Sequence, residues 1–324
     1  MRTRRLGFTD LELTTVGLGT WAIGGPWDFG WGPQDDAESV ATIHRALDLG
    51  INWMDTAPAY GLGHSEEIVG KAIRGRRDDV IVATKCGLVW DNPSTRSVES
   101  RLKAASVRKE AEASLRRLQV DVIDLYQIHW PNPEVDLEEA WEEIARLVEE
   151  GKVRYAGVSN FSIEQIERAR RIHPVASLQP PYSMVQRSVE RDLLDYCLEN
   201  EIGVVVYSPM QAGLLTGKFS RDLFAALPED DWRRKNSQFQ DPDFGATLAL
   251  VDRLRPVAER AGRSLAELAI AWVLRRPAVT AAIVGARRPD QIEQTSNAGN
   301  WQLTSAQVDT IEELLATREA GIGS

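Results

Sequence analysis

The sequence has few of the residues that build disulfide frameworks or metal sites. Its 324 residues include two cysteines, Cys86 and Cys197, and four histidines. Two cysteines cannot form a disulfide framework, so the protein is expected to occupy a reducing compartment, the cytoplasm. The sequence also lacks a His-Glu-x-x-His motif. We therefore expect no metal site.

Long apolar runs and a surplus of basic residues are missing as well. No run approaches the roughly 18 apolar residues that span a bilayer, and no apolar stretch follows the basic start of the chain, Met1–Arg5. Lysine and arginine number 38 against 48 acidic residues, a net charge of −10. This balance argues against nucleic acid as a partner. The sequence predicts a soluble protein that binds neither membranes nor nucleic acid, and it does not indicate an oligomeric state.

A regular alternation of short apolar segments and amphipathic segments is present instead. Alternating strands and helices indicate a parallel sheet, because parallel neighbours need a crossover connection. Eight such units predict one α/β domain over residues 1–324, a (β/α)₈ TIM barrel. The expected strands are 16–21, 51–56, 80–85, 122–129, 153–159, 177–179, 202–208 and 281–285. Helical patterns lie near residues 36–49, 65–74, 104–118, 137–150, 162–172, 188–200, 247–262 and 264–276.

Three segments do not belong to the repeating strand–helix units. Residues 4–14 predict an N-terminal β-hairpin that turns at Thr9–Asp10 and closes the barrel bottom. Residues 264–276 predict an extra helix, opened by a capping box of Ser264 and Glu267. Residues 210–246 form a long irregular segment, and loops of this length in compact domains are usually functional.

Four ionisable residues stand at or just after the ends of neighbouring strands. Asp55 ends the second strand, Tyr60 follows it in the loop, Lys85 ends the third strand and His129 ends the fourth. Taken singly, each has a plainer explanation: a turn cap, a loop aromatic, a lysine that reaches solvent, and a core histidine. Because the site of such a barrel lies at the carboxyl ends of its strands, we expect the four side chains to meet.

Together these groups have a use in catalysis. A buried Lys85 needs a counter-charge, which Asp55 supplies. The ammonium group is expected to lower the pKa of Tyr60 from its usual value near 10, so that Tyr60 donates a proton to a carbonyl oxygen. A neutral His129 would donate a second hydrogen bond to the same oxygen.

At this point the sequence resembles the aldo-keto reductase superfamily, and within it the bacterial general reductases, which are similar to potassium channel β-subunits. The resemblance extends from about Arg4 to Thr317. It rests on the ordered motifs Gly17-Leu-Gly-Thr-Trp21, Asp55-Thr-Ala-Pro-Ala-Tyr60-Gly, Ala83-Thr-Lys85, Gln127-Ile-His129-Trp, Gly157-Val-Ser159-Asn160, Tyr207-Ser-Pro209 and Gly213-Leu-Leu-Thr-Gly217-Lys218. It implies hydride transfer from NADPH to an aldehyde or ketone, with Asp55, Tyr60, Lys85 and His129 as the catalytic tetrad and Tyr60 as the general acid.

The same resemblance implies the positions that hold the cofactor. Ser159, Asn160 and Gln179 match the residues that bind the nicotinamide amide, and Tyr207 matches the aromatic residue that stacks on the ring. Arg287 matches the contact to the adenosine 2′-phosphate, which indicates NADP(H); NAD(H) stays possible, because Gln294-Thr295 replaces the Glu-Asn of many relatives. The further matching positions are Gly19, Thr20, Trp21, Asp55, Ser208, Pro209, Gln211, Gly213, Leu214, Lys218, Gly285 and Gln291.

The substrate side of the site is expected to be aromatic. Trp21 and Trp130 adjoin motifs at strand ends, and with Tyr60 and His129 they are predicted to contact the substrate. An aromatic pocket discriminates weakly among carbonyl compounds, so the substrate and the direction of reaction stay open. Two alternatives also stay open: an NADPH-binding redox sensor with little turnover, and a barrel enzyme that uses Lys85 as a Schiff base.

Overall fold

A closed barrel of parallel strands forms the centre of the molecule. The computed structural model describes residues 1–95 and 97–322. Within them eight strands pair in the order β10-β11-β12-β3-β4-β5-β8-β9, and β9 pairs with β10 to close the ring. These strands are β3 (Val16–Gly19), β4 (Trp53–Asp55), β5 (Ile81–Cys86), β8 (Ile123–Ile128), β9 (Val153–Ser159), β10 (Ser177–Gln179), β11 (Gly203–Val206) and β12 (Val279–Gly285). The (β/α)₈ fold that the sequence predicts is thus confirmed.

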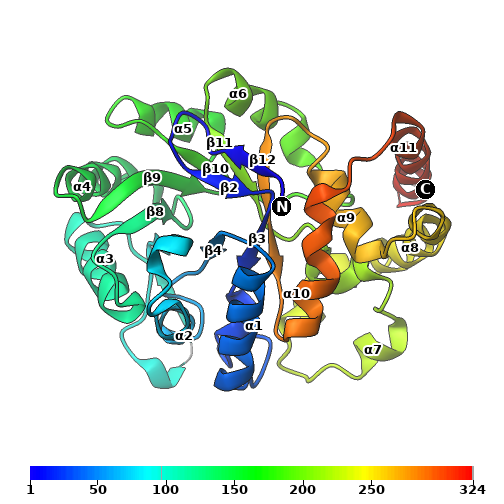
Figure 1. Ribbon diagram of the computed structural model, residues 1–324, viewed down its shortest axis with the longest axis horizontal. Coiled ribbons are helices and arrows are strands. Elements are labelled where there is room, and N and C mark those ends of the chain that lie inside the picture. Colours follow the sequence, from blue (N-terminus) through cyan, green and yellow to red (C-terminus); the bar gives the residue numbers. More distant parts are fainter. Residues whose placement is uncertain (96, 323–324) are drawn as a thin grey trace.

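Helices surround this barrel on its outside (Figure 1). They are α1 (Asp36–Asp48), α2 (His64–Ile73), α3 (Ala104–Leu118), α4 (Leu137–Glu149), α5 (Ile163–Arg170), α6 (Leu193–Glu199), α7 (Arg221–Ala225), α8 (Asp243–Arg260), α9 (Leu265–Val273), α10 (Pro289–Ser296) and α11 (Ser305–Ile322). In Figure 1, α8 and α11 lie together at the right, and α7 lies apart from the others at the lower right. Over the described part of the chain, no helix combines the length and the apolar character needed to cross a membrane.

Several predicted boundaries differ from the structure. The expected helix 188–200 is broken into a 3-10 turn, Ser188–Glu190, and α6. The irregular segment predicted over 210–246 ends at Pro242, because α8 begins at Asp243. A small antiparallel pair, β6 (Leu88–Val89) and β7 (Glu99–Ser100), was not predicted. Two-residue strands carry too few residues to show the alternation on which a strand prediction depends.

The N-terminal hairpin closes one end of the barrel, as expected. β1 (Thr3–Arg5) pairs with β2 (Glu12–Thr14). Leu6, Leu11 and Leu13 are buried among barrel-lining side chains such as Trp53 and Val205. Burying each leucine contributes about 1.5–3 kcal/mol to stability. The packing of these side chains therefore holds the hairpin firmly against the end of the barrel.

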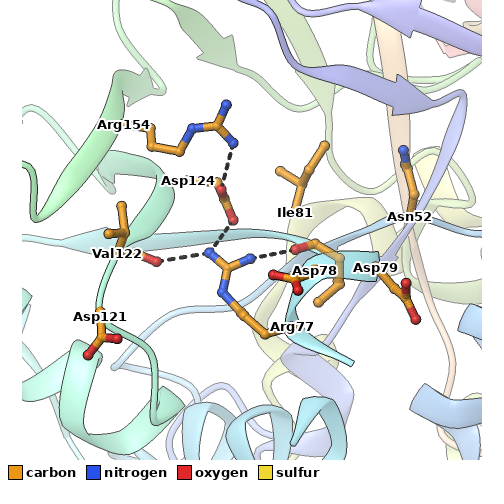
Figure 2. A pocket seen from close by; sticks show the side chains of 10 residues that line it. Asn52, Arg77, Asp78, Asp79, Ile81, Asp121, Val122, Asp124 and Arg154 are labelled. Atoms are coloured by element: carbon orange, nitrogen blue, oxygen red, sulfur yellow. Dashed lines mark hydrogen bonds and ion pairs between the residues drawn. The ribbon is translucent and has the colours of Figure 1, made fainter. Parts of the chain in front are cut away.

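A hollow of about 490 Å³ lies at the same end, where the strands begin. Figure 2 shows Arg77 and Arg154 reaching the Asp124 carboxylate from opposite sides of this hollow. The Asp124 carboxylate is buried and also accepts a hydrogen bond from the Val82 amide at 2.9 Å. Since both oxygens of this carboxylate are bonded within the fold, and since barrel chemistry takes place at the other end, we interpret this cluster as structural.

Candidate active site

The predicted tetrad gathers at the opposite end of the barrel because of strand register and side-chain alternation. Side chains two apart along a strand point to the same face. Asp55 pairs with Ala83 across β4 and β5, and Lys85 pairs with Gln127 across β5 and β8. Trp53, Ala83 and Leu125 fill the barrel interior, so Asp55, Lys85 and Gln127 lie one layer above them.

Asp55 and Lys85 form a buried ion pair at the centre of the site. Lys85 Nζ lies 2.6 Å from Asp55 Oδ1, and both side chains are almost completely shielded from solvent. Lys85 Nζ also donates to the Thr56 carbonyl at 2.9 Å. Burial lowers the pKa of Lys85, and the Asp55 charge opposes that shift. The Asp55 carboxylate thus keeps the Lys85 ammonium group charged in a buried environment that would otherwise favour the neutral amine.

Tyr60 is the third member of this cluster. Lys85 Nζ lies 3.2 Å from the Tyr60 hydroxyl. Burial, and then the Asp55 charge, raise the pKa of Tyr60 well above 10. The expectation that Lys85 lowers the pKa of Tyr60 is therefore wrong, because the Asp55 carboxylate offsets the ammonium charge and desolvation penalises the phenolate. Tyr60 consequently holds its proton throughout the physiological pH range.

His129 completes the predicted set from the end of β8. Its ring lies edge-on to the Tyr60 ring, with the centroids 5.9 Å apart. Burial, and then the Lys85 charge, lower the pKa of His129 well below 6.5. A neutral imidazole keeps one N–H donor and one acceptor, so His129 can donate a single hydrogen bond to a ligand beside Tyr60.

Two glutamine amides hold the second oxygen of Asp55. Gln179 Nε2 donates to Asp55 Oδ2 at 2.8 Å and lies 3.2 Å from Gln127 Oε1. Gln127 Nε2 makes a longer contact to the same carboxylate oxygen at 3.5 Å. Gln127 was not predicted as a site residue, although a polar residue facing inward in an apolar strand was a usable signal. These amides fix the orientation of the carboxylate that faces Lys85.

The residues predicted to bind the nicotinamide amide are gathered beside the tetrad. Asn160 Nδ2 donates to the His129 carbonyl at 3.1 Å, and Asn160 Oδ1 accepts from the Tyr207 hydroxyl at 2.9 Å. Ser159 Oγ donates to the Gln179 carbonyl at 2.8 Å. The side-chain amide of Asn160 and the ring of Tyr207 therefore adjoin His129 and the other predicted tetrad residues.

The segment after β11 supplies the next group of predicted positions. Ser208 and Gln211 have positive φ angles of 56° and 49°, and Gly213 has a φ of 97°. This backbone turns sharply after Pro209 and ends near Lys218, whose Nζ lies 3.3 Å from Gln294 Oε1 on α10. Two of the predicted positions use their side chains for contacts within the fold. The Gln211 amide bonds Ser183 and Gln238, and Leu214 packs against Phe239 and Phe244.

The remaining predicted positions lie where β3 meets β12. Gly19 pairs with Gly285, and a Cβ at Gly285 would meet no other atom within 4 Å. Thr20 donates to the Asp55 carbonyl through both its amide and its hydroxyl, at 3.0 and 3.1 Å. Gln291 Oε1 accepts from the Arg287 amide at 2.7 Å, at the start of α10. This end is open and carries Arg287 at a helix N-terminus, a suitable setting for a phosphate.

Aromatic side chains surround the entrance of the site at the carboxyl ends of the strands, as the sequence suggested. Trp21 contacts Trp31 and Trp232, with ring centroids 5.7 and 5.3 Å away, and Trp27 lies 6.1 Å from Tyr60. Trp232 was not predicted, because its irregular segment gives no periodic pattern. Trp130, predicted to contact substrate, is 44% exposed.

The donor set fits a nicotinamide dinucleotide. Side-chain amides and a tyrosine ring adjoin the tetrad, whereas Lys218 and Arg287 supply positive charge near α10. Across residues 1–95 and 97–322, no three His, Cys, Asp or Glu side chains are grouped so that they could hold a metal ion. The chemistry that this arrangement supports is transfer of a proton from Tyr60 to an oxygen held between Tyr60 and His129.

Comparison with known proteins gives a consistent result. Residues 15–316 match the model of the Aldo/keto reductase family. The chain is 44% identical over 310 residues to "Aldo-keto reductase YhdN" of Bacillus subtilis (strain 168), covering 95% of this chain and 91% of that protein. It is 35% identical over 327 residues to "NADH-specific methylglyoxal reductase" of Escherichia coli (strain K12), covering 97% and 98%. The solved structure of the glycerol dehydrogenase AKR11B4 from Gluconobacter oxydans aligns with a TM-score of 0.89 at 43% identity, covering 98% of this chain and 95% of that one.

Proposed function

The chain belongs to the aldo/keto reductase family of NAD(P)H-dependent oxidoreductases, and from that premise we propose that it reduces small aldehydes and ketones to alcohols with Tyr60 as the proton donor. The observation that carries the proposal is the contact of one buried ammonium group, Lys85 Nζ, with both the Asp55 carboxylate and the Tyr60 hydroxyl. This arrangement suits a site in which a phenol must release a proton and then regain it.

In this proposal Tyr60 donates the proton, and Lys85 and Asp55 stabilise the phenolate that remains. When NAD(P)H is bound, it supplies the hydride that reduces the carbonyl carbon. Tyr60 Oη gives its proton to the carbonyl oxygen, and the phenolate that remains lies 3.2 Å from Lys85 Nζ. The ammonium charge stabilises this phenolate, while Asp55 keeps Lys85 charged. Since the pKa of Tyr60 is raised, the proton is present at Oη when the carbonyl arrives.

His129 orients the substrate in this scheme. Its pKa lies well below 6.5, so the ring is neutral and donates one hydrogen bond without supplying a competing proton. A carbonyl oxygen held between the imidazole and the Tyr60 hydroxyl is fixed on two sides. Orientation of this kind supplies part of the rate enhancement by keeping the reacting atoms close.

We propose short, oxygen-rich carbonyl compounds as the substrate class. Five buried indole N–H groups find no acceptor within the described residues, and four of them, those of Trp21, Trp27, Trp31 and Trp232, belong to the aromatic side chains around the site. An unpaired buried donor costs about 1–3 kcal/mol, so a ligand that brings oxygen acceptors is favoured there. The names of two relatives refer to oxygen-rich three-carbon compounds: the carbonyl compound methylglyoxal and the alcohol glycerol.

Consumption of NADPH and of NADH with a panel of aldehydes tests the proposal. We expect oxidation of the cofactor with methylglyoxal and glyceraldehyde, and slower oxidation with apolar aldehydes of similar size, which offer the indoles fewer acceptors. The measurement is the decrease in absorbance of the reduced nicotinamide. Tight cofactor binding without turnover on any member of the panel would contradict the proposal and favour a sensing role.

The pH profile of kcat gives a second expected result. A general acid works only while protonated, so activity is retained below the pKa of Tyr60, which lies above 10, and is lost as the pH rises through it. His129 stays neutral above about pH 6.5 because its pKa is lowered. We therefore expect kcat for reduction to be flat from pH 6.5 to the point where the Lys85–Tyr60 pair loses a proton. A decline of kcat as the pH rises through the range below 6.5 where His129 loses its proton, measured at saturating cofactor, would show that the imidazole carries the proton instead.

A further inference from the structure

The guanidinium group of Arg287 is held by the loop that follows β3. Arg287 Nε donates to Gln34 Oε1 at 2.6 Å, Nη1 donates to the Trp31 carbonyl at 3.1 Å, and Nη2 donates to the Pro33 carbonyl. Gln34 Nε2 donates in return to the Arg287 carbonyl at 3.0 Å. We call this set of contacts between Arg287 and residues 31–34 the clasp.

The clasp satisfies the hydrogen bonds of Arg287 but leaves its charge unpaired. All three acceptors are neutral, and Arg287 makes no ion pair with any residue that the structure describes. Its neighbours are paired differently: Arg233 with Asp231, and Arg288 with Asp290. A half-buried cation that lies just before α10 and makes no ion pair, with only the more distant charge of Glu38 acting on it, is suited to an anionic ligand.

The loop half of the clasp is itself fixed in place. The Trp31 ring contacts Trp21 and Trp232, with centroids 5.7 and 6.0 Å away. The Arg233 guanidinium lies 4.6 Å from the centre of the Trp31 ring. Because the loop is anchored by these contacts, its carbonyl groups are preorganised acceptors for Arg287 and compete effectively with a ligand.

From this competition we propose that Gln34 is a specificity-determining residue, which restrains Arg287 and thereby reduces the preference of the enzyme for NADP(H) over NAD(H). The inference rests on the proposed function and on the role that the resemblance implies for Arg287, which is contact with the 2′-phosphate. NAD(H) lacks that phosphate, so it gains nothing when Arg287 leaves the loop. NADP(H) gains a charge-assisted contact only at the expense of the hydrogen bonds of the clasp.

The variant Gln34→Leu removes the side-chain acceptor and its return donor while keeping a similar volume. We expect the dissociation constant of NADP⁺ to fall about fivefold to tenfold, the equivalent of one or two neutral hydrogen bonds. The dissociation constant of NAD⁺ should change less than twofold. Isothermal titration calorimetry with the full chain measures both constants without depending on turnover.

Two further variants make the test specific. In Gln34→Leu/Arg287→Ala the gain in NADP⁺ affinity should disappear, because the released group is absent. Gln302→Leu makes the same chemical change at an exposed position outside the clasp and should leave both constants unchanged. An equal effect of Gln34→Leu on both cofactors, or none on either, would overturn the clasp proposal while the proposed function stands. If the unmodified protein binds neither cofactor, that result contradicts the proposed function itself, and the variants no longer test the clasp.

Discussion

Replacing Tyr60 by phenylalanine is expected to lower kcat by about 10²–10⁴-fold, the usual contribution of a positioned general acid. The substitution removes only the hydroxyl, which lies 3.2 Å from Lys85 Nζ, and keeps the ring between Trp27 and His129. Cofactor affinity should therefore change little. The measurements are steady-state turnover of methylglyoxal and calorimetric titration of NADP⁺ with the same preparation.

A matched control uses the same chemical change at the other end of the barrel. Tyr155 donates to Asp10 Oδ1 at 3.0 Å beside the N-terminal hairpin, away from the tetrad. Tyr155→Phe should leave kcat within about twofold of the unmodified enzyme, because the hydrogen bonds between Tyr155 and Asp10 lie at the surface and contribute little to the distant site. Near-normal turnover of Tyr60→Phe would refute the assignment of Tyr60 as the proton donor.

Removing the charge of Asp55 is expected to destabilise the fold and the site together. In Asp55→Asn the buried Lys85 ammonium loses its counter-charge at 2.6 Å, and breaking a buried ion pair in this way costs about 3–5 kcal/mol. Part of that cost disappears if Lys85 releases its proton, but a neutral lysine no longer stabilises the Tyr60 phenolate. We expect a lower free energy of unfolding, measured in urea, and a large loss of kcat.

Two further variants distinguish the effect of breaking the buried Asp55–Lys85 pair from the effect of removing any charged group. Glu293→Gln breaks the exposed pair with Arg45 and should lower the free energy of unfolding by less than about 1 kcal/mol, because water and salt screen surface pairs. The double variant Asp55→Leu/Lys85→Met should be more stable than the sum of the two single losses predicts, since no unpaired charge remains. Strict additivity would show that the two groups do not interact as the structure indicates.

The sequence sufficed to predict the barrel and the four tetrad residues because both depend on short-range patterns. Apolar strands that end in a polar residue are visible in the chain itself, and a parallel barrel brings every strand end to one face. Asp55, Lys85 and His129 need no further information to be placed together. The capping box of Ser264 and Glu267 is equally local, and the structure contains it.

The predicted cofactor contacts depended on the resemblance to the family. The structure shows which groups each of these side chains touches. Ser159, Asn160 and Tyr207 lie beside the tetrad, as that resemblance implies. Gln211 and Leu214 bind other parts of the fold through their side chains. Which way a side chain faces in an irregular segment depends on contacts between residues far apart in sequence, and no periodicity encodes it.

The electrostatics of the site and its long-range contacts arise only in the folded molecule. The raised pKa of Tyr60 follows from its burial and from the competing charge of Asp55, and neither can be read from a motif. The clasp joins residues 31–34 to Arg287, and Trp31 meets Trp232, across more than 200 positions of the chain. The order of residues along the chain specifies which side chains stand at the strand ends. Their protonation and partners emerged only on folding, because desolvation and long-range contacts exist only in the packed molecule.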